Sequence, residues 1–132
     1  VLEDMVLEDD SLGDECLVQE GQSMKCRAGK STGWFSWDGK MMPCGMMNSP
    51  IAYPFEEGVK NAWSKIIEET DKLRLPIECS NCKKRGICKA CAATSVAETG
   101  DISKVPKYMC EMTDRIIEKV SNAYKEMAME KV

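Results

Sequence analysis

Histidine is absent from the 132 residues of this chain, and aromatic residues make up only 6% of it. Without histidine the chain can form neither a Ser-His-Asp triad nor a mixed cysteine–histidine metal site. Its scattered carboxylates show no pairing typical of acid–base catalysis. Basic residues are also in the minority, with 18 Lys and Arg against 22 Asp and Glu, and the resulting net charge of −4 argues against a nucleic-acid partner.

Long apolar runs are missing as well. No stretch approaches eighteen consecutive apolar residues, so the sequence predicts no membrane-spanning helix and no membrane partner. The amino-terminal VLEDMVLEDD has neither the basic region nor the apolar region of a signal peptide, and we therefore expect a cytoplasmic protein. The length favours one domain with a modest core. Because the chain begins at Val1 rather than Met, we expect it to be a piece of a longer protein.

Cysteine, in contrast, is abundant. Four of the eight cysteines fall within ECSNCKKRGICKAC, residues 78–91, as two C-x2-C pairs. An even count allows a disulfide framework, but the lack of an export signal and the helical patterns elsewhere favour metal binding. From spacing alone, C-x2-C-x5-C-x2-C is compatible with a four-cysteine zinc site and with iron–sulfur ligation about equally. Eight thiolates without histidine divide naturally into two four-ligand sites.

A β-hairpin is predicted over residues 32–44, where two apolar runs flank Asp38-Gly39. That dipeptide is typical of a two-residue type I′ turn. The resulting register would pair Trp37 with Lys40, Phe35 with Met42 and Gly33 with Cys44, which leaves space beside Cys44. Trp34 would then lie on the opposite side, where we interpret it as an interface residue.

Two amphipathic helices are predicted from apolar residues at helical spacing. The first runs from Glu56 to about Arg74 and ends before Pro76, with the stripe around Trp63 as core. The second follows Thr113, a predicted N-cap. Between them the sequence predicts cysteine-rich loops, and residues 97–110 are expected to be a loop in which Glu98 and Asp101 belong to a turn. The predicted class is therefore α+β: a small hairpin, two amphipathic helices and cysteine-rich metal-binding loops.

The order of these features carries a resemblance to a known family. Cys26, Gly39 and Cys44, then the cysteines at 79, 82, 88 and 91, and finally Cys110 resemble the seven-cysteine signature of the SPASM domain. CRAGKS, DGKMMPCG, and Gly100-Asp101 followed by PKYMC add to the match, which covers about residues 16–113. That domain is the carboxy-terminal extension of many radical S-adenosylmethionine enzymes that modify peptides and proteins, including anaerobic sulfatase maturases.

The resemblance implies two auxiliary [4Fe-4S] clusters with interleaved ligands. The first cluster would be held by Cys16, Cys26, Cys44 and Cys91. The second would be held by Cys79, Cys82, Cys88 and Cys110. Nearby, Lys83, Lys84 and Arg85 would offset cluster charge or, as we favour from sequence, would simply be solvated.

Read in this way, residues 1–15 lead in from a missing upstream radical S-adenosylmethionine barrel, 16–113 form the two-cluster domain, and 114–132 form a carboxy-terminal helix. The chain lacks the C-x3-C-x2-C motif of the catalytic cluster, so we expect no activity from it alone. The implied function is electron transfer, positioning of a peptide or protein substrate, or both. The alternative is a structural interaction module in which the same eight cysteines hold two zinc ions, which an aerobic preparation would also favour.

Overall fold

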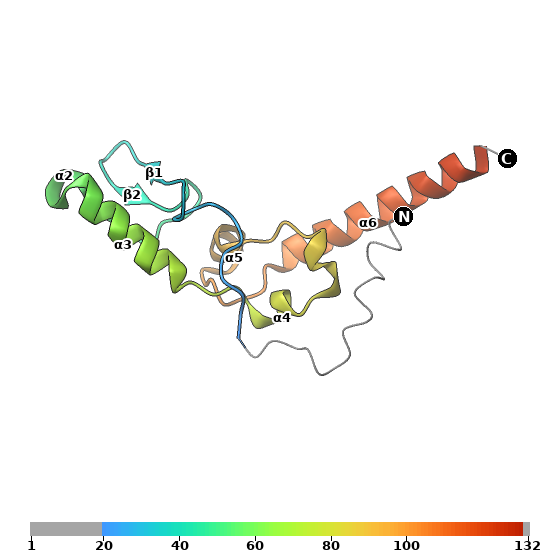
Figure 1. Ribbon diagram of the computed structural model, residues 1–132. Helices are drawn as coiled ribbons and strands as arrows, with labels where there is room; N and C mark the ends of the chain where they lie inside the picture. The colour runs from blue at the N-terminus through green and yellow to red at the C-terminus, as the bar shows by residue number, and fades with distance from the viewer. Residues whose placement is uncertain (1–19, 131–132) are drawn as a thin grey trace.

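The computed structural model describes residues 20–130, which form a mostly helical domain with a two-stranded antiparallel sheet (Figure 1). None of the helices in this range combines the length and apolar character that a membrane crossing requires. In chain order the elements are β1 (Trp34–Phe35), β2 (Met41–Met42), α2 (Pro54–Glu57), α3 (Val59–Asp71), α4 (Ile77–Ser80), the 3-10 helix η2 (Lys83–Gly86), α5 (Ala92–Thr99) and α6 (Lys107–Glu130).

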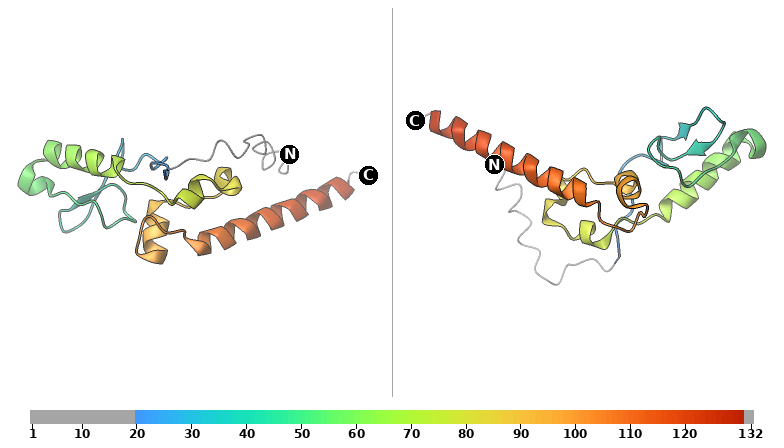
Figure 2. Two further views of the ribbon diagram at one scale, coloured as in Figure 1. Left: turned by 90° about the horizontal axis from the view of Figure 1, so that it is seen from below. Right: turned by 180° about the vertical axis from the view of Figure 1, so that it is seen from behind.

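The elements are strung out along the molecule. The hairpin packs beside α3 at one end, α4 and α5 lie in the middle, and α6 projects from the other end (Figures 1 and 2). Two small apolar clusters hold this arrangement together. One joins the hairpin to α3 through Met41, Ala52, Ala62 and Ile66. The central one consists of Met24, Ala28, Met47, Leu75, Ala92 and Ala93.

The hairpin is present, but its predicted register is wrong by one residue. Trp34 pairs with Met42 and Phe35 with Met41, rather than Phe35 with Met42. The cause is the turn. Gly39 alone has a positive φ, of 81°, whereas a type I′ turn needs positive φ at Asp38 too.

The observed loop therefore contains three residues instead of two. The amide of Gly39 donates to Ser36 O at 3.0 Å, and the amide of Ser36 donates to Lys40 O at 2.9 Å. This is the pattern of a type I turn closed by a residue in the left-handed region. Trp37, predicted to face Lys40 on the apolar side, is in the turn and is fully exposed.

The first predicted helix, Glu56 to Arg74, is divided into α2 and α3 by Gly58, which has a φ of 82°. Its core face was predicted only in part. Ala62 and Ile66 are buried and Trp63 packs partly buried against them, but Val59 and Ile67 are exposed.

The second predicted helix, expected to follow Thr113, begins at Lys107, the first residue of α6. Thr113 is therefore not an N-cap: it is buried inside the helix, and its hydroxyl donates to Met109 O at 2.7 Å. The amide of Tyr108 in the first turn instead donates to the Glu98 carboxylate at 3.0 Å. Because this acceptor comes from α5, no local pattern around Thr113 reveals it. Cys110 consequently lies on a helix, not in the predicted loop.

Helix α5 was not predicted at all; its last three residues, 97–99, fall in the segment expected to be a loop. Cys91 precedes it, and the amide of Cys91 donates to Thr94 Oγ1 at 2.8 Å. Gly100 follows it with a left-handed φ, and its amide donates to Val96 O at 2.8 Å. These are ordinary start and stop signals. The start signal was missed in the sequence because cysteine is not among the usual N-cap residues.

The hairpin turn yields a prediction about acid titration. Lys40 Nζ lies 2.6 Å from Asp38 Oδ2, and the Ser36 hydroxyl also donates to Asp38. The lysine first and the serine second hold the pKa of Asp38 below its ordinary value of 3.8. Because this carboxyl pKa is depressed in the folded state, its contribution to hairpin stability is present above the unfolded pKa and is lost as pH falls through the folded value.

We therefore expect the Asp38 carboxyl to titrate below 3.8 in an NMR pH series of the folded protein. In Lys40→Ala the midpoint should rise toward that value, since the main partner is gone. A wild-type midpoint at or above 3.8 would contradict the turn described here.

Candidate metal centre

Four of the predicted ligands gather where the 79–91 segment meets the start of α6. Cys79 lies on α4, Cys82 and Cys88 flank η2, and Cys110 is on α6. All four are half-buried. The segment is a succession of tight turns, in which the amide of Arg85 donates to Cys82 O at 2.9 Å and the amide of Cys88 to Lys84 O at 2.8 Å.

These four thiols act on one another electrostatically. Burial is the main cause that raises the pKa of Cys79 above its ordinary value of 9.0, and the nearby thiol of Cys110 is the next, ahead of Cys88 and Cys82. Burial also raises the pKa of Cys110, followed by Cys88 and Cys82. Like charges interact measurably only at short range in a hydrated protein. In agreement, the ion pair between Lys84 and Asp114 joins η2 to the part of α6 that carries Cys110.

The remaining predicted ligands lie around the central apolar cluster. Cys44 and Cys91 both pack against it. Cys26 is exposed, and together with Cys91 it lines a cavity of about 340 Å³. Cys88 lines the same cavity, so it neighbours both groups of thiols. Cys16, the remaining predicted ligand, lies outside the described residues.

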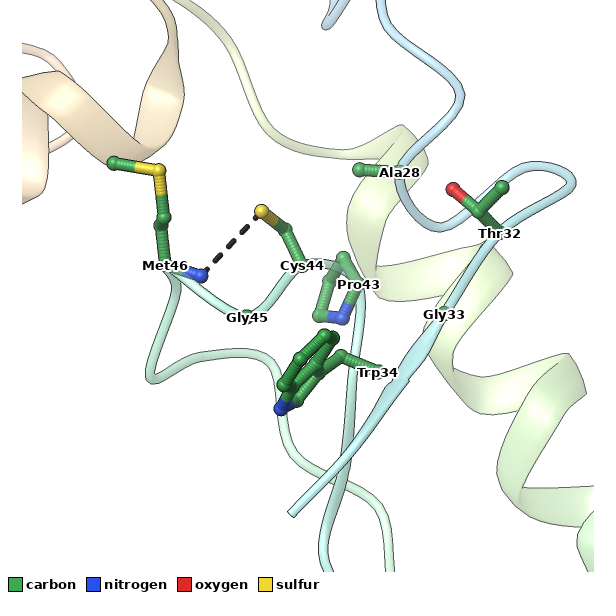
Figure 3. A pocket seen from close by; sticks show the side chains of 8 residues that line it. All are labelled: Ala28, Thr32, Gly33, Trp34, Pro43, Cys44, Gly45 and Met46. Atoms are coloured by element: carbon green, nitrogen blue, oxygen red, sulfur yellow. Dashed lines mark hydrogen bonds between the residues drawn. The ribbon is translucent and has the colours of Figure 1, made fainter.

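Backbone amides donate to two of the sulfurs, and a hydroxyl lies near a third. The amide of Met46 donates to Cys44 Sγ at 3.5 Å (Figure 3), and the amide of Ala90 donates to Cys88 Sγ at 3.4 Å. The Thr94 hydroxyl lies 3.8 Å from Cys91 Sγ. Hydrogen bonds of this kind stabilise negative charge on sulfur and tune metal–thiolate sites.

An apolar cavity of about 530 Å³ opens beside Cys44, between the hairpin and the segment that follows it (Figure 3). The indole of Trp34 covers Gly45, where an added methyl group would lie 3.0 Å from the ring. Trp34 therefore lies on the same side as Cys44, and its predicted place on the opposite face is wrong because the hairpin register differs. The predicted space beside Cys44 exists, but Gly33 does not pair with Cys44 to create it.

The basic triplet near these thiols is not simply solvated, as the sequence had favoured. Lys84 pairs with Asp114 of α6 and so ties η2 to the helix that carries Cys110. The Asp114 carboxylate is the main cause that raises the pKa of Lys84, and the thiols of Cys82 and Cys110 contribute less. Arg85 is half-buried and donates to Ala90 O at 2.8 Å.

The seven cysteines within residues 20–130 are free thiols. Over that same range, no three Cys, Asp or Glu side chains are drawn together tightly enough to hold a single metal ion. No protein-family model, curated protein or solved structure matches this chain. The resemblance described above therefore rests on the order and spacing of the cysteines.

The proximity of Cys79 and Cys110 can be tested without metal. In the reduced, metal-free protein, Cys110→Ser should lower the pKa of Cys79 because a neighbouring negative charge is removed, while burial should keep the pKa above its ordinary value of 9.0. The measurement is the pH dependence of the iodoacetamide reaction at Cys79, followed by peptide mass spectrometry. Cys44→Ser serves as the matched control and should leave Cys79 unchanged. A Cys79 pKa that is identical in wild type and Cys110→Ser would show that the two thiols are apart.

Proposed function

We propose that this chain is an iron–sulfur domain with two [4Fe-4S] clusters, belonging to a radical S-adenosylmethionine enzyme that modifies peptides or proteins. The observation that carries the proposal is the ion pair between Lys84 of η2 and Asp114 of α6, which ties the turn between Cys82 and Cys88 to the helix that carries Cys110. A site confined to the 79–91 loop would use Cys91 as the fourth ligand. The interleaved arrangement uses Cys110 instead.

The donor set fits the proposed clusters. Iron–sulfur clusters are held by cysteine thiolates, and the described cysteines are free, mostly half-buried, and accompanied by hydrogen-bond donors to sulfur. Cys79, Cys82, Cys88 and Cys110 would hold one cluster, and Cys26, Cys44 and Cys91 with Cys16 the other. Bound clusters would supply one-electron transfer. The protein would fix their places and adjust their potentials through charge and hydrogen bonds.

Positioning of a peptide substrate is the second part of the proposed role. The cavity next to Cys44 is lined mainly by apolar groups, including Trp34, Pro43 and Met46, and it is open to an incoming side chain. Half of the Trp34 surface is exposed there. An apolar residue of the peptide could occupy this cavity and lie beside the first cluster, while the upstream barrel carries out the radical chemistry.

Anaerobic reconstitution with iron and sulfide tests the proposal directly. The protein should turn brown and bind about eight iron atoms and eight sulfides per chain, as two [4Fe-4S] clusters require. Absorption spectra and metal analysis provide the readout. A colourless protein that binds two zinc ions in preference to iron would establish the structural zinc module instead.

The interleaved assignment of ligands to the two clusters can be tested separately on the reconstituted protein. Replacing Cys91 with alanine should disturb the amide resonances around Cys44 and spare those around Cys110, because the two residues belong to different clusters. Cys110→Ala should do the reverse. A Cys91 variant that perturbs Cys79 and Cys82 but leaves Cys44 undisturbed would restore a single site within the 79–91 loop.

A further inference from the structure

Arg85 is half-buried, as Lys84 is, but its partner is a backbone carbonyl of the cysteine-rich segment rather than a carboxylate. It is the last side chain before Gly86 in η2, and it turns back along the chain to donate from Nη1 to Ala90 O at 2.8 Å. Lys89, four residues later, is exposed. A guanidinium is permanently charged and directs its donors in a fixed plane, so a half-buried arginine can both orient a carbonyl and supply charge.

The carbonyl that Arg85 holds belongs to the peptide group between Ala90 and Cys91. On the other side of that peptide group, the Cys91 amide donates to Thr94 Oγ1 at 2.8 Å. The preceding amide, that of Ala90, donates to Cys88 Sγ at 3.4 Å. Arg85 and Thr94 therefore fix both ends of one peptide unit, which lies in the turn that connects Cys88 to Cys91.

The charge of Arg85 lies between the two groups of thiols. Arg85 lines the 340 Å³ cavity together with Cys26, Cys88 and Cys91. Cys88 belongs to one proposed cluster, and Cys26 and Cys91 belong to the other.

We propose that Arg85 is a positioning residue shared by both cluster sites, which holds the Cys88–Cys91 turn through Ala90 O and raises the reduction potential of both clusters through its charge. The inference rests on the proposed function. Reduction adds an electron to a site that is already negative, so a fixed positive charge nearby favours the reduced form. Burial reduces the screening by solvent and salt that weakens exposed charges.

The test compares Arg85→Gln, Arg85→Lys and the control Lys89→Gln after reconstitution of the full chain. Lys89 lines the same cavity and carries the same charge, but it is exposed. Redox titration with dithionite, monitored by electron paramagnetic resonance, gives the potential of each cluster. Arg85→Gln should shift the one-electron reduction equilibrium of both clusters about tenfold toward the oxidised form, or about 59 mV. Lys89→Gln should shift it less than about threefold, as expected for a solvent-screened charge.

The Arg85→Lys variant distinguishes the effect of the positive charge from the effect of the hydrogen bond to Ala90 O. It should restore the potentials to within about threefold of wild type, because the charge is kept, yet still shift the amide resonances of Cys91, because a lysine lacks the planar donor geometry. If Arg85→Gln does not take up clusters, the Arg85→Lys variant provides the test. Cluster uptake by Arg85→Lys with near-normal potentials supports the proposal, and failure of Arg85→Lys to take up clusters overturns it. Equal potential shifts in Arg85→Gln and Lys89→Gln, or none in either, would also overturn it.

The outcomes distinguish this inference from the function on which it rests. A wild-type chain that takes up no iron overturns both. A wild-type chain with two clusters whose potentials do not depend on Arg85 overturns the inference alone and leaves the proposed iron–sulfur function standing.

Discussion

The central apolar cluster around Leu75 is the constraint on which the rest of the structure depends. It collects side chains from segments that are distant in sequence: Met24 and Ala28 near the start, Met47 after the hairpin, Leu75 after α3, and Ala92 and Ala93 on α5. Half of its members are alanines, which allow the segments to approach closely, and the Leu75 amide donates to Gln22 O at 2.9 Å. Cys44 and Cys91 lie on the surface of this cluster, and its packing therefore brings them into the same region.

The cysteine-rich segment is organised by backbone polar groups more than by apolar burial. Within residues 76–91 only Pro76 and Ala90 are buried, while amide–carbonyl bonds and bonds to sulfur define successive turns. Side chains then anchor the segment at two points: Lys84 reaches Asp114 on α6, and Arg85 holds the carbonyl of Ala90. In small metal-binding domains, a segment with so little core gains much of its order from the bound metal. This agrees with the proposed function, in which the clusters complete the fold.

For the hairpin and helix α6, the predicted and observed elements differ in exact position rather than in type. The hairpin was predicted from Asp38-Gly39, and a hairpin is present, but a single positive φ at Gly39 in place of two lengthened the loop and moved Trp34 to the side of Cys44. Helix α6 was recognised from its apolar stripe, but its start was placed at Thr113 because the acceptor at its true start, Glu98, comes from α5. In both cases the type of element followed from local pattern. The exact position was set by the backbone conformation of the turn in the hairpin and by a contact from α5 in α6.

The sequence by itself determined the donor chemistry: eight thiols, no histidine, two C-x2-C pairs, and a hairpin and two amphipathic stripes around them. These features are local, because residue type sets ligand softness and the spacing of apolar residues sets helical periodicity. Only the tertiary structure decided which thiols are neighbours. Cys110 comes close to Cys79 because α6 starts at Lys107 and is tied to η2 by Lys84 and Asp114. From sequence, Arg85 was likewise predicted to be one of three solvated cations. Only the folded turn and the hydrogen bond to Ala90 O place it in the cavity beside thiols of both groups.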